Sequence, residues 1–131
     1  MDDQALVELA LRMRERAYAP YSGYRVGAAL LSASGQVFTG CNVENAVYPL
    51  GLCAERVAVF KAISEGERGF TAIAIATENG GTPCGACCQV LSEFVPDLRI
   101  LLVDAKGAVR ETSLRRLLPE PFGPRDLKAV R

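Results

Sequence analysis

The sequence predicts an α/β fold in three layers, α/β/α, with a central mixed five-stranded sheet between helices. Three observations predict it. A hairpin pattern near the N-terminus is followed by segments that alternate helix, strand, helix and strand. Two of the later strand segments are almost entirely apolar, which is typical of strands covered on both faces. Half of the 131 residues are hydrophobic, so we expect residues 1–131 to form a single domain with one core.

The N-terminal part is predicted to contain an amphipathic helix and a hairpin. Asp2 and Asp3 are candidate N-caps for the helix. Its apolar face recurs at helical spacing, at Leu6, Leu9, Ala10, Met13 and Ala17. Residues 24–32 and 36–43 have the pattern of two strands joined by a short turn. Residues 46–52 contain a proline and a glycine and are expected to form a loop.

The rest of the chain alternates between helix and strand patterns. Gly66 is placed to end a helix, and Pro96 stops the next one. The turn before that second helix ends in Thr82-Pro83, an N-cap residue followed by the residue favoured in a first helical turn. The predicted elements are helices over 53–65 and 84–94, buried strands over 70–76 and 99–104, a short strand over 108–111, and short helices over 113–117 and 126–130.

Charge balance and residue counts exclude several function classes. Fifteen basic and fifteen acidic residues cancel, which leaves no overall field for binding nucleic acid. The absence of histidine excludes Ser-His-Asp triads, Cys-His dyads and histidine metal ligands. No apolar run is long enough to span a bilayer, and the acidic start Met1-Asp2-Asp3 is unlike a secretory signal. We therefore expect a cytoplasmic protein with no membrane partner, whose thiols are not in disulfides.

The strongest local motif is Pro83-Cys84-Gly85-Ala86-Cys87, a C-x-x-C pair that opens a predicted helix. Cys53 opens another predicted helix, with Glu55 two residues further on. Helix N-termini stabilise thiolates. Three thiolates from two such termini can cap one face of Zn²⁺ and leave its fourth position open to water, which a catalytic site requires. Glu55 is then placed to move the protons of that water.

The residues alone leave other interpretations open. The C-x-x-C motif could be a redox pair, which requires neither Cys53 nor Glu55. The thiols could also pack as small hydrophobic residues, or form a closed structural zinc site completed by Cys41 or Cys88, as in a non-catalytic binding module. We interpret Cys41 and Cys88 as packing residues.

Taken together, Cys53-Ala54-Glu55 and the C-x-x-C motif match the all-cysteine form of the zinc deaminase motif, in which the glutamate is the general acid and base and not a ligand. The chain thereby resembles the small homotetrameric cytidine deaminases over almost its whole length. Further stretches that carry the resemblance are Pro20-Tyr21-Ser22, Val26-Gly27-Ala28-Ala29-Leu30, Asn42-Val43-Glu44-Asn45-Ala46, Cys53-Ala54-Glu55-Arg56, and Leu117-Leu118-Pro119 followed by Phe122.

The resemblance implies a cytidine deaminase-like fold and a zinc-dependent activity in pyrimidine salvage. The implied reaction is the hydrolytic deamination of cytidine and deoxycytidine to uridine and deoxyuridine, with release of ammonia. An alternative within the same chemistry is another cytosine-containing nucleoside, such as a nucleoside antibiotic. The implied assembly is a homotetramer with shared active sites.

The resemblance also assigns roles to single residues. One Zn²⁺ per chain is bound by Cys53, Cys84 and Cys87, and Glu55 shuttles protons. The residues assigned to the substrate are Asn42 and Glu44 for the ribose, the backbone amide of Ala54 and the ring of Tyr24 for the base, and Tyr48 and Phe122 as aromatic residues lent by neighbouring subunits.

One position departs from the family pattern. An arginine usually follows the second cysteine of the C-x-x-C motif, whereas Cys88, followed by Gln89, stands there in this chain. The change removes a positive charge beside a site that three thiolates leave net negative even with zinc bound. We therefore expect Arg56, together with the two helix dipoles, to stabilise the thiolates.

Overall fold

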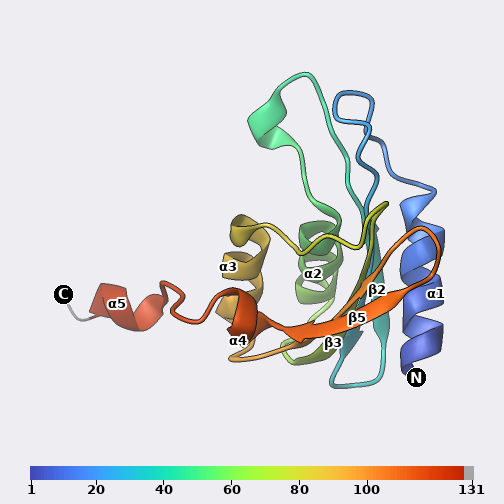
Figure 1. Ribbon diagram of the computed structural model, residues 1–131. Helices are drawn as coiled ribbons and strands as arrows, with labels where there is room; N and C mark the ends of the chain where they lie inside the picture. The colour runs from blue at the N-terminus through green and yellow to red at the C-terminus, as the bar shows by residue number, and fades with distance from the viewer. Residues whose placement is uncertain (129–131) are drawn as a thin grey trace.

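A mixed five-stranded sheet forms the centre of the computed structural model, which describes residues 1–128 (Figure 1). The strands lie in the order β2-β1-β3-β4-β5. Their bounds are Gly27–Ser32 for β1, Val37–Cys41 for β2, Phe70–Ala76 for β3, Arg99–Val103 for β4 and Val109–Ser113 for β5. β3 and β4 are parallel and the other neighbouring strands are antiparallel, so the mixed sheet predicted from the sequence is confirmed.

Helices cover both faces of this sheet, which confirms the three layers. Figure 1 shows α1 on one side of the strands and α2 and α3 on the other. The helices are α1 (Asp3–Arg14), α2 (Ala54–Ser64), α3 (Gly85–Phe94), α4 (Leu114–Leu117) and α5 (Pro124–Lys128), with a 3-10 turn, η1, at Tyr48–Leu50.

Two apolar clusters hold the layers together. The first packs α1 on the sheet and contains Leu6, Val7, Ala10, Ala29, Ala72, Ala74, Ala76, Leu101 and Val103. The second lies under α2 and α3 and takes the alternate residues of the same strands, including Ile73 and Ile75 of β3. Because successive side chains point to opposite faces, β3 is buried on both sides, which explains its almost continuous apolar sequence.

A glycine in β2 brings the start of α2 close to the sheet. A Cβ added at Gly40 would lie 2.4 Å from the carbonyl oxygen of Ala54 and 2.8 Å from the backbone nitrogen of Ala58. Only glycine allows this approach of helix backbone to strand backbone. The first turn of α2, which carries Glu55, is therefore fixed against β2.

Strand register gathers several polar residues at one end of the sheet. Gly27 at the start of β1 lies opposite Cys41 at the end of β2 and Ala76 at the end of β3. The residues just beyond these strand ends, Asn42 and Thr77, therefore lie close together.

Several element boundaries differ from the sequence prediction. The first strand begins at Gly27 and not at residue 24, and the second spans Val37–Cys41 and not 36–43. The first strand starts later because the backbone groups before it bond to a side chain and not to a neighbouring strand. The side chain of Asn42 accepts from the backbone N–H of Val26 and donates to the carbonyl of Tyr24. The predicted loop 46–52 contains η1.

The helix ends also differ. α1 stops at Arg14, and the chain continues in tighter turns with hydrogen bonds from each residue to the third before it, so Ala17 is outside the helix. The last helix begins at Pro124, because proline is favoured in a first helical turn, and the prediction had placed it at 126–130. Its predicted end, at residues 129 and 130, lies outside the described residues.

Candidate active site

Three cysteine sulfur atoms meet at the starts of α2 and α3. Cys53 is the N-cap residue of α2, Cys84 is the N-cap residue of α3, and Cys87 lies in the first turn of α3. All three Sγ atoms lie within 4.8 Å of one another, and those of Cys84 and Cys87 are 3.5 Å apart. Sulfur ligands about 2.3 Å from a tetrahedral Zn²⁺ lie about 3.8 Å from each other, so this cluster fits a zinc ion.

The cluster offers three ligands and leaves one tetrahedral position free. Among residues 1–128, no further cysteine and no acidic side chain joins the three sulfur atoms within this distance. Cys88 is 2% exposed and packs in the hydrophobic core under α3, as expected. Cys41 is half-buried, and its thiol donates to the carbonyl of Arg16. Neither Cys41 nor Cys88 is therefore placed to complete a closed structural zinc site.

Hydrogen bonding gives Cys53 and Cys87 different roles within the cluster. Cys87 donates to Cys53, and with the guanidinium of Arg56 it lowers the pKa of Cys53 to about 5. The same bond and burial raise the pKa of Cys87. The cluster therefore stabilises one thiolate readily, while a further negative charge needs a compensating cation such as a metal ion.

Glu55 is buried next to this cluster. The residue is 4% exposed and lies in the first turn of α2. Burial raises the pKa of its carboxyl, and the neighbouring Cys53 thiolate acts in the same direction. A carboxyl group with a raised pKa can both hold and release a proton nearer to neutral pH, which suits a general acid and base.

Arg56, which is half-buried, contacts the sulfur cluster at Cys53. Its Nη2 is 3.4 Å from the Sγ of Cys53. Its Nε is buried with no hydrogen-bond partner among residues 1–128. Arg56 thus retains an unused hydrogen-bond donor, its Nε, beside the sulfur cluster. Cys88, which stands where the family usually has an arginine, supplies no positive charge there.

A pocket of about 290 Å³ opens above Cys53, Cys84 and Glu55. Its lining residues are Ser22, Tyr24, Val26, Asn42, Glu44, Cys53, Glu55, Ile75, Thr77, Thr82, Pro83 and Cys84. No lysine or arginine belongs to this lining within the described part of the chain. The pocket therefore combines a candidate metal centre with a lining that carries no positive charge.

Two polar residues of the pocket also hold its loops. Asn42 accepts from the backbone N–H of Val26 and donates to the carbonyl of Tyr24. Glu44 accepts from the backbone N–H groups of Tyr21 and Ser22 and from the Ser22 hydroxyl, and these bonds lower the pKa of its carboxyl. Since an amide and a carboxylate each have more hydrogen-bonding positions than are used here, both can also bind a ligand.

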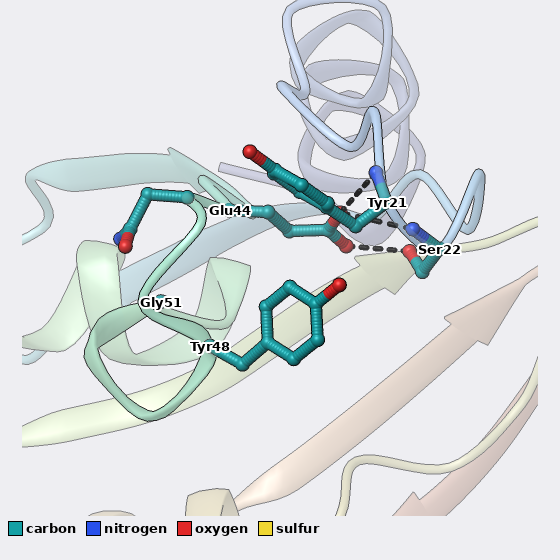
Figure 2. A pocket seen from close by; sticks show the side chains of 6 residues that line it. Tyr21, Ser22, Glu44, Tyr48 and Gly51 are labelled. Atoms are coloured by element: carbon teal, nitrogen blue, oxygen red, sulfur yellow. Dashed lines mark hydrogen bonds between the residues drawn. The ribbon is translucent and has the colours of Figure 1, made fainter.

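A second hollow of about 340 Å³ adjoins the pocket and shares Ser22 and Glu44 with it (Figure 2). The rings of Tyr21 and Tyr48 flank it edge to face, with their centroids 5.3 Å apart. Tyr48 is 71% exposed. This aromatic hollow lies open on the surface of the chain.

The structure brings most of the residues singled out in the sequence to one place. Those that line the pocket are Tyr24, Asn42, Glu44, Cys53, Glu55 and Cys84. Ala54 is fully buried in the first turn of α2. Tyr48 lies in the neighbouring hollow. Phe122 is 59% exposed, and its carbonyl accepts a hydrogen bond from the side chain of Gln89. Neither residue belongs to the lining of the pocket.

Sequence reasoning gave no part in the site to several residues of the lining. The polar ones are Ser22, Thr77 and Thr82. The sequence predicted Thr82 only as the N-cap residue of the second helix, and that prediction is wrong, because α3 begins at Gly85 and Cys84 is its N-cap residue. Thr77 directly follows the buried strand β3, and a polar residue at the end of such a strand is the signal that could have found it. Asn79, which bonds to Tyr24, stands in a glycine-rich turn and has no such signal.

A cluster of three sulfur atoms that fits a zinc ion and leaves one position open, next to a buried glutamate on this fold, is the arrangement of a zinc-dependent deaminase. Comparison with known proteins places the chain in a family within that class. It belongs to the cytidine and deoxycytidylate deaminases, since the model of the zinc-binding region of that family matches residues 1–102.

Relatives and solved structures agree with this assignment. The chain is 45% identical over 130 residues to the cytidine deaminase of Sporosarcina psychrophila, an alignment covering 97% of this chain and 96% of the relative. It is 47% identical to that of Halalkalibacterium halodurans, covering 97% and 98% of the two chains. The crystal structure of cytidine deaminase from Burkholderia pseudomallei superposes with a TM-score of 0.88 at 51% identity, covering 93% of this chain and 100% of that one.

Proposed function

We propose that this chain converts cytidine and deoxycytidine to uridine and deoxyuridine by hydrolytic deamination, as a step of pyrimidine salvage. The similar proteins named as cytidine deaminases support this substrate, and the sulfur cluster beside Glu55 supports the chemistry. The observation that carries the choice of a nucleoside is the charge of the pocket lining. With Glu44 and Glu55 in it and no cation, the lining favours a neutral sugar over a phosphate.

Different residues of the pocket bind the ribose and the base of the substrate. Asn42 and Glu44 have free hydrogen-bonding positions for the ribose hydroxyls. The ring of Tyr24 forms a wall for the base. The backbone amide of Ala54, in the first turn of α2, has no partner within its own helix and donates to the base.

Glu55 moves the protons of the reaction. When bound, zinc supplies the Lewis acidity that lowers the pKa of a water molecule. Glu55 accepts a proton from the attacking water and delivers it to N3 of the ring, as water adds to C4. The carboxylate then takes the proton of the new C4 hydroxyl and passes it to the leaving amine, which departs as ammonia and leaves a carbonyl at C4. Arg56 balances the charge of the thiolates throughout.

A substrate panel tests the nucleoside assignment. We expect the zinc-loaded chain to deaminate cytidine and deoxycytidine, and to leave cytidine monophosphate and free cytosine almost unchanged. Loss of absorbance at the cytosine band measures each rate, and the Glu55→Gln variant serves as the inactive control. Preference for the monophosphate would contradict the assignment, because the lining offers no cation for a phosphate.

We infer that the chain assembles as a homotetramer whose subunits share active sites. The support is the large apolar surface near the pocket: Val47, Tyr48 and Leu50 are 56%, 71% and 70% exposed. Apolar patches of this kind mark protein interfaces. The segment that carries Phe122 and α5 also extends away from the body of the chain (Figure 1). In the assembly, Tyr48 and Phe122 complete the pockets of neighbouring subunits.

Sedimentation equilibrium tests the assembly. We expect a particle of four times the chain mass of 14.0 kDa. Leu50→Asp should break the assembly and remove activity together, because it puts a charge into the apolar surface. Val109→Asp alters an apolar residue that is 48% exposed on β5 and serves as the matched control. A fully active monomer would rule out shared sites.

We also propose that residues 1–131 form one catalytic domain that works in the cytoplasm. Both apolar clusters pack on a single sheet, which supports one domain. All five cysteines are free thiols, and a sulfur-bound metal site requires reduced cysteines. Over residues 1–128, no helix is long and apolar enough to cross a membrane.

A further inference from the structure

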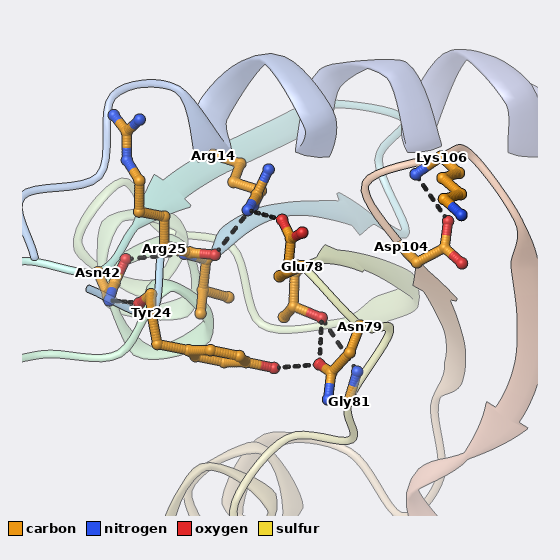
Figure 3. A network of polar contacts seen from close by, with 11 residues as sticks. Arg14, Tyr24, Arg25, Asn42, Glu78, Asn79, Gly81, Asp104 and Lys106 are labelled. Carbon is orange, nitrogen blue, oxygen red and sulfur yellow. Dashed lines mark hydrogen bonds and ion pairs between the residues drawn. The ribbon is translucent and has the colours of Figure 1, made fainter. Parts of the chain in front are cut away.

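Two segments that are distant in the sequence are joined by a side-chain hydrogen bond at the rim of the pocket. The hydroxyl of Tyr24 donates to the Oδ1 of Asn79 over 2.7 Å (Figure 3). Tyr24 lies before β1, whereas Asn79 lies in the segment that links β3 to Cys84 and α3. The bond therefore ties the aromatic wall of the pocket to the segment that leads into a metal ligand.

Thr77 and Gly81 lie close to the acceptor of this bond, the Oδ1 of Asn79. The Thr77 hydroxyl lies 3.5 Å from the same Oδ1 of Asn79 and accepts from the backbone N–H of Gly81. A Cβ added at Gly81 would lie 2.9 Å from the Tyr24 hydroxyl and 3.3 Å from the Asn79 Oδ1. The turn thus approaches the bond closely enough that only a residue without a side chain fits without displacing it.

The backbone around both residues is held independently. Asn42 donates to the carbonyl of Tyr24. Arg14 of α1 donates through Nε to the carbonyl of Arg25, and its Nη2 lies 2.8 Å from the carboxylate of Glu78. The neighbours of Tyr24 and Asn79 are thus attached to one guanidinium, as Figure 3 shows. With both backbones held, the Tyr24–Asn79 bond determines where the Tyr24 ring lies and not whether the loops fold.

We propose that the hydroxyl of Tyr24, through Asn79, is a positioning device for the substrate. It fixes the plane of the Tyr24 ring over the pocket, so that the base meets a preorganised wall and no binding free energy is used to order the ring. The effect falls on substrate affinity and not on the chemical step, since the hydrogen bonds of Tyr24 and Asn79 within residues 1–128 join them to each other, to Ser22, to Asn42 and to Thr77, and none to Glu55 or the sulfur cluster. This inference rests on the proposed function, because it takes the pocket to bind the nucleoside.

Tyr24→Phe and Asn79→Ala test the device. Each should raise KM for cytidine by about 2- to 10-fold, the equivalent of one net hydrogen bond, with kcat changed less than about 2-fold. The double variant should be no worse than the more affected single variant, because both remove the same bond. Zinc content and Tm should stay as in the wild type. Tyr18→Phe is the matched control, since Tyr18 is 57% exposed and belongs to the described lining of neither hollow.

A binding measurement separates this inference from the proposed function. In the Glu55→Gln background, where turnover is blocked, Tyr24→Phe should weaken calorimetric binding of cytidine by the same factor as it raises KM. An active wild type whose KM is unaffected by Tyr24→Phe overturns the positioning role alone. Additive effects in the double variant also overturn the positioning role. A fall in kcat and Tm without a change in KM overturns it as well, because that result indicates a merely structural bond. A zinc-loaded wild type that does not deaminate cytidine instead overturns the proposed function.

Discussion

Replacing Glu55 with glutamine should stop turnover while leaving the zinc in place. Glutamine has nearly the same shape as the buried glutamate side chain, so the first turn of α2 and the sulfur cluster should keep their structure. It cannot accept or release a proton. We expect kcat to fall by about 10²- to 10⁴-fold, the usual contribution of general acid–base catalysis. Steady-state rates and the zinc-to-protein ratio of the same sample measure both halves of the expectation.

Glu65→Gln is the matched control for this variant. Glu65 is exposed and caps the other end of the same helix, so the same chemical change there should alter neither kcat nor metal content. A Glu55→Gln enzyme with wild-type activity would show that the carboxyl is not the proton carrier. Loss of zinc from that variant would show instead that the carboxylate holds the metal, contrary to its place outside the sulfur cluster.

Replacing Cys84 with alanine should remove both the zinc and the activity. The change leaves two sulfur ligands of three, and Cys84 is exposed, so no cavity forms in the core. We expect zinc affinity to fall by more than about 100-fold, the upper end of the effect of losing a residue that only supports a ligand. Competition with a chromophoric chelator measures the affinity. Cys53→Ala should behave in the same way, whereas a redox pair formed by Cys84 and Cys87 would not need Cys53.

Cys41→Ala is the control, because this half-buried thiol lies outside the cluster. An active Cys84→Ala variant that retains zinc would contradict the three-sulfur site.

The zinc affinity of the wild type should also depend on pH with a definite sign. The hydrogen bond to Cys53 and burial raise the pKa of Cys87, so zinc must displace a proton that this thiol holds when no metal is bound. Zinc affinity should therefore fall as the pH falls.

Much of the fold could be predicted because the signals are local. The apolar run of β3 and the cap at Asp2 depend on residues close in the sequence, and both are found in the structure. The first strand was predicted to start too early because residues 24–26 have strand-like composition. Their backbone groups are used by the side chain of Asn42, a partner that no local pattern reveals.

The site could be predicted in part for a similar reason. The cysteines and Glu55 occupy helix starts, where residue type and spacing carry the chemistry. Asn79 could not be found, because an exposed asparagine beside glycines has the composition of an ordinary turn. Its role depends on the hydroxyl of Tyr24, which reaches it only through the packing of β1 on β3.

By itself, the sequence determined which elements form and which side chains stand at the first turns of α2 and α3, since capping and periodicity act over a few residues. Only the tertiary structure decided that the sulfur of Cys53 meets those of Cys84 and Cys87, and that Cys88 turns into the core. That meeting requires two helices to pack side by side on one sheet, with Gly40 admitting the backbone of α2. Contacts of this kind depend on the packing of the whole core and therefore cannot be predicted from any single segment of the sequence.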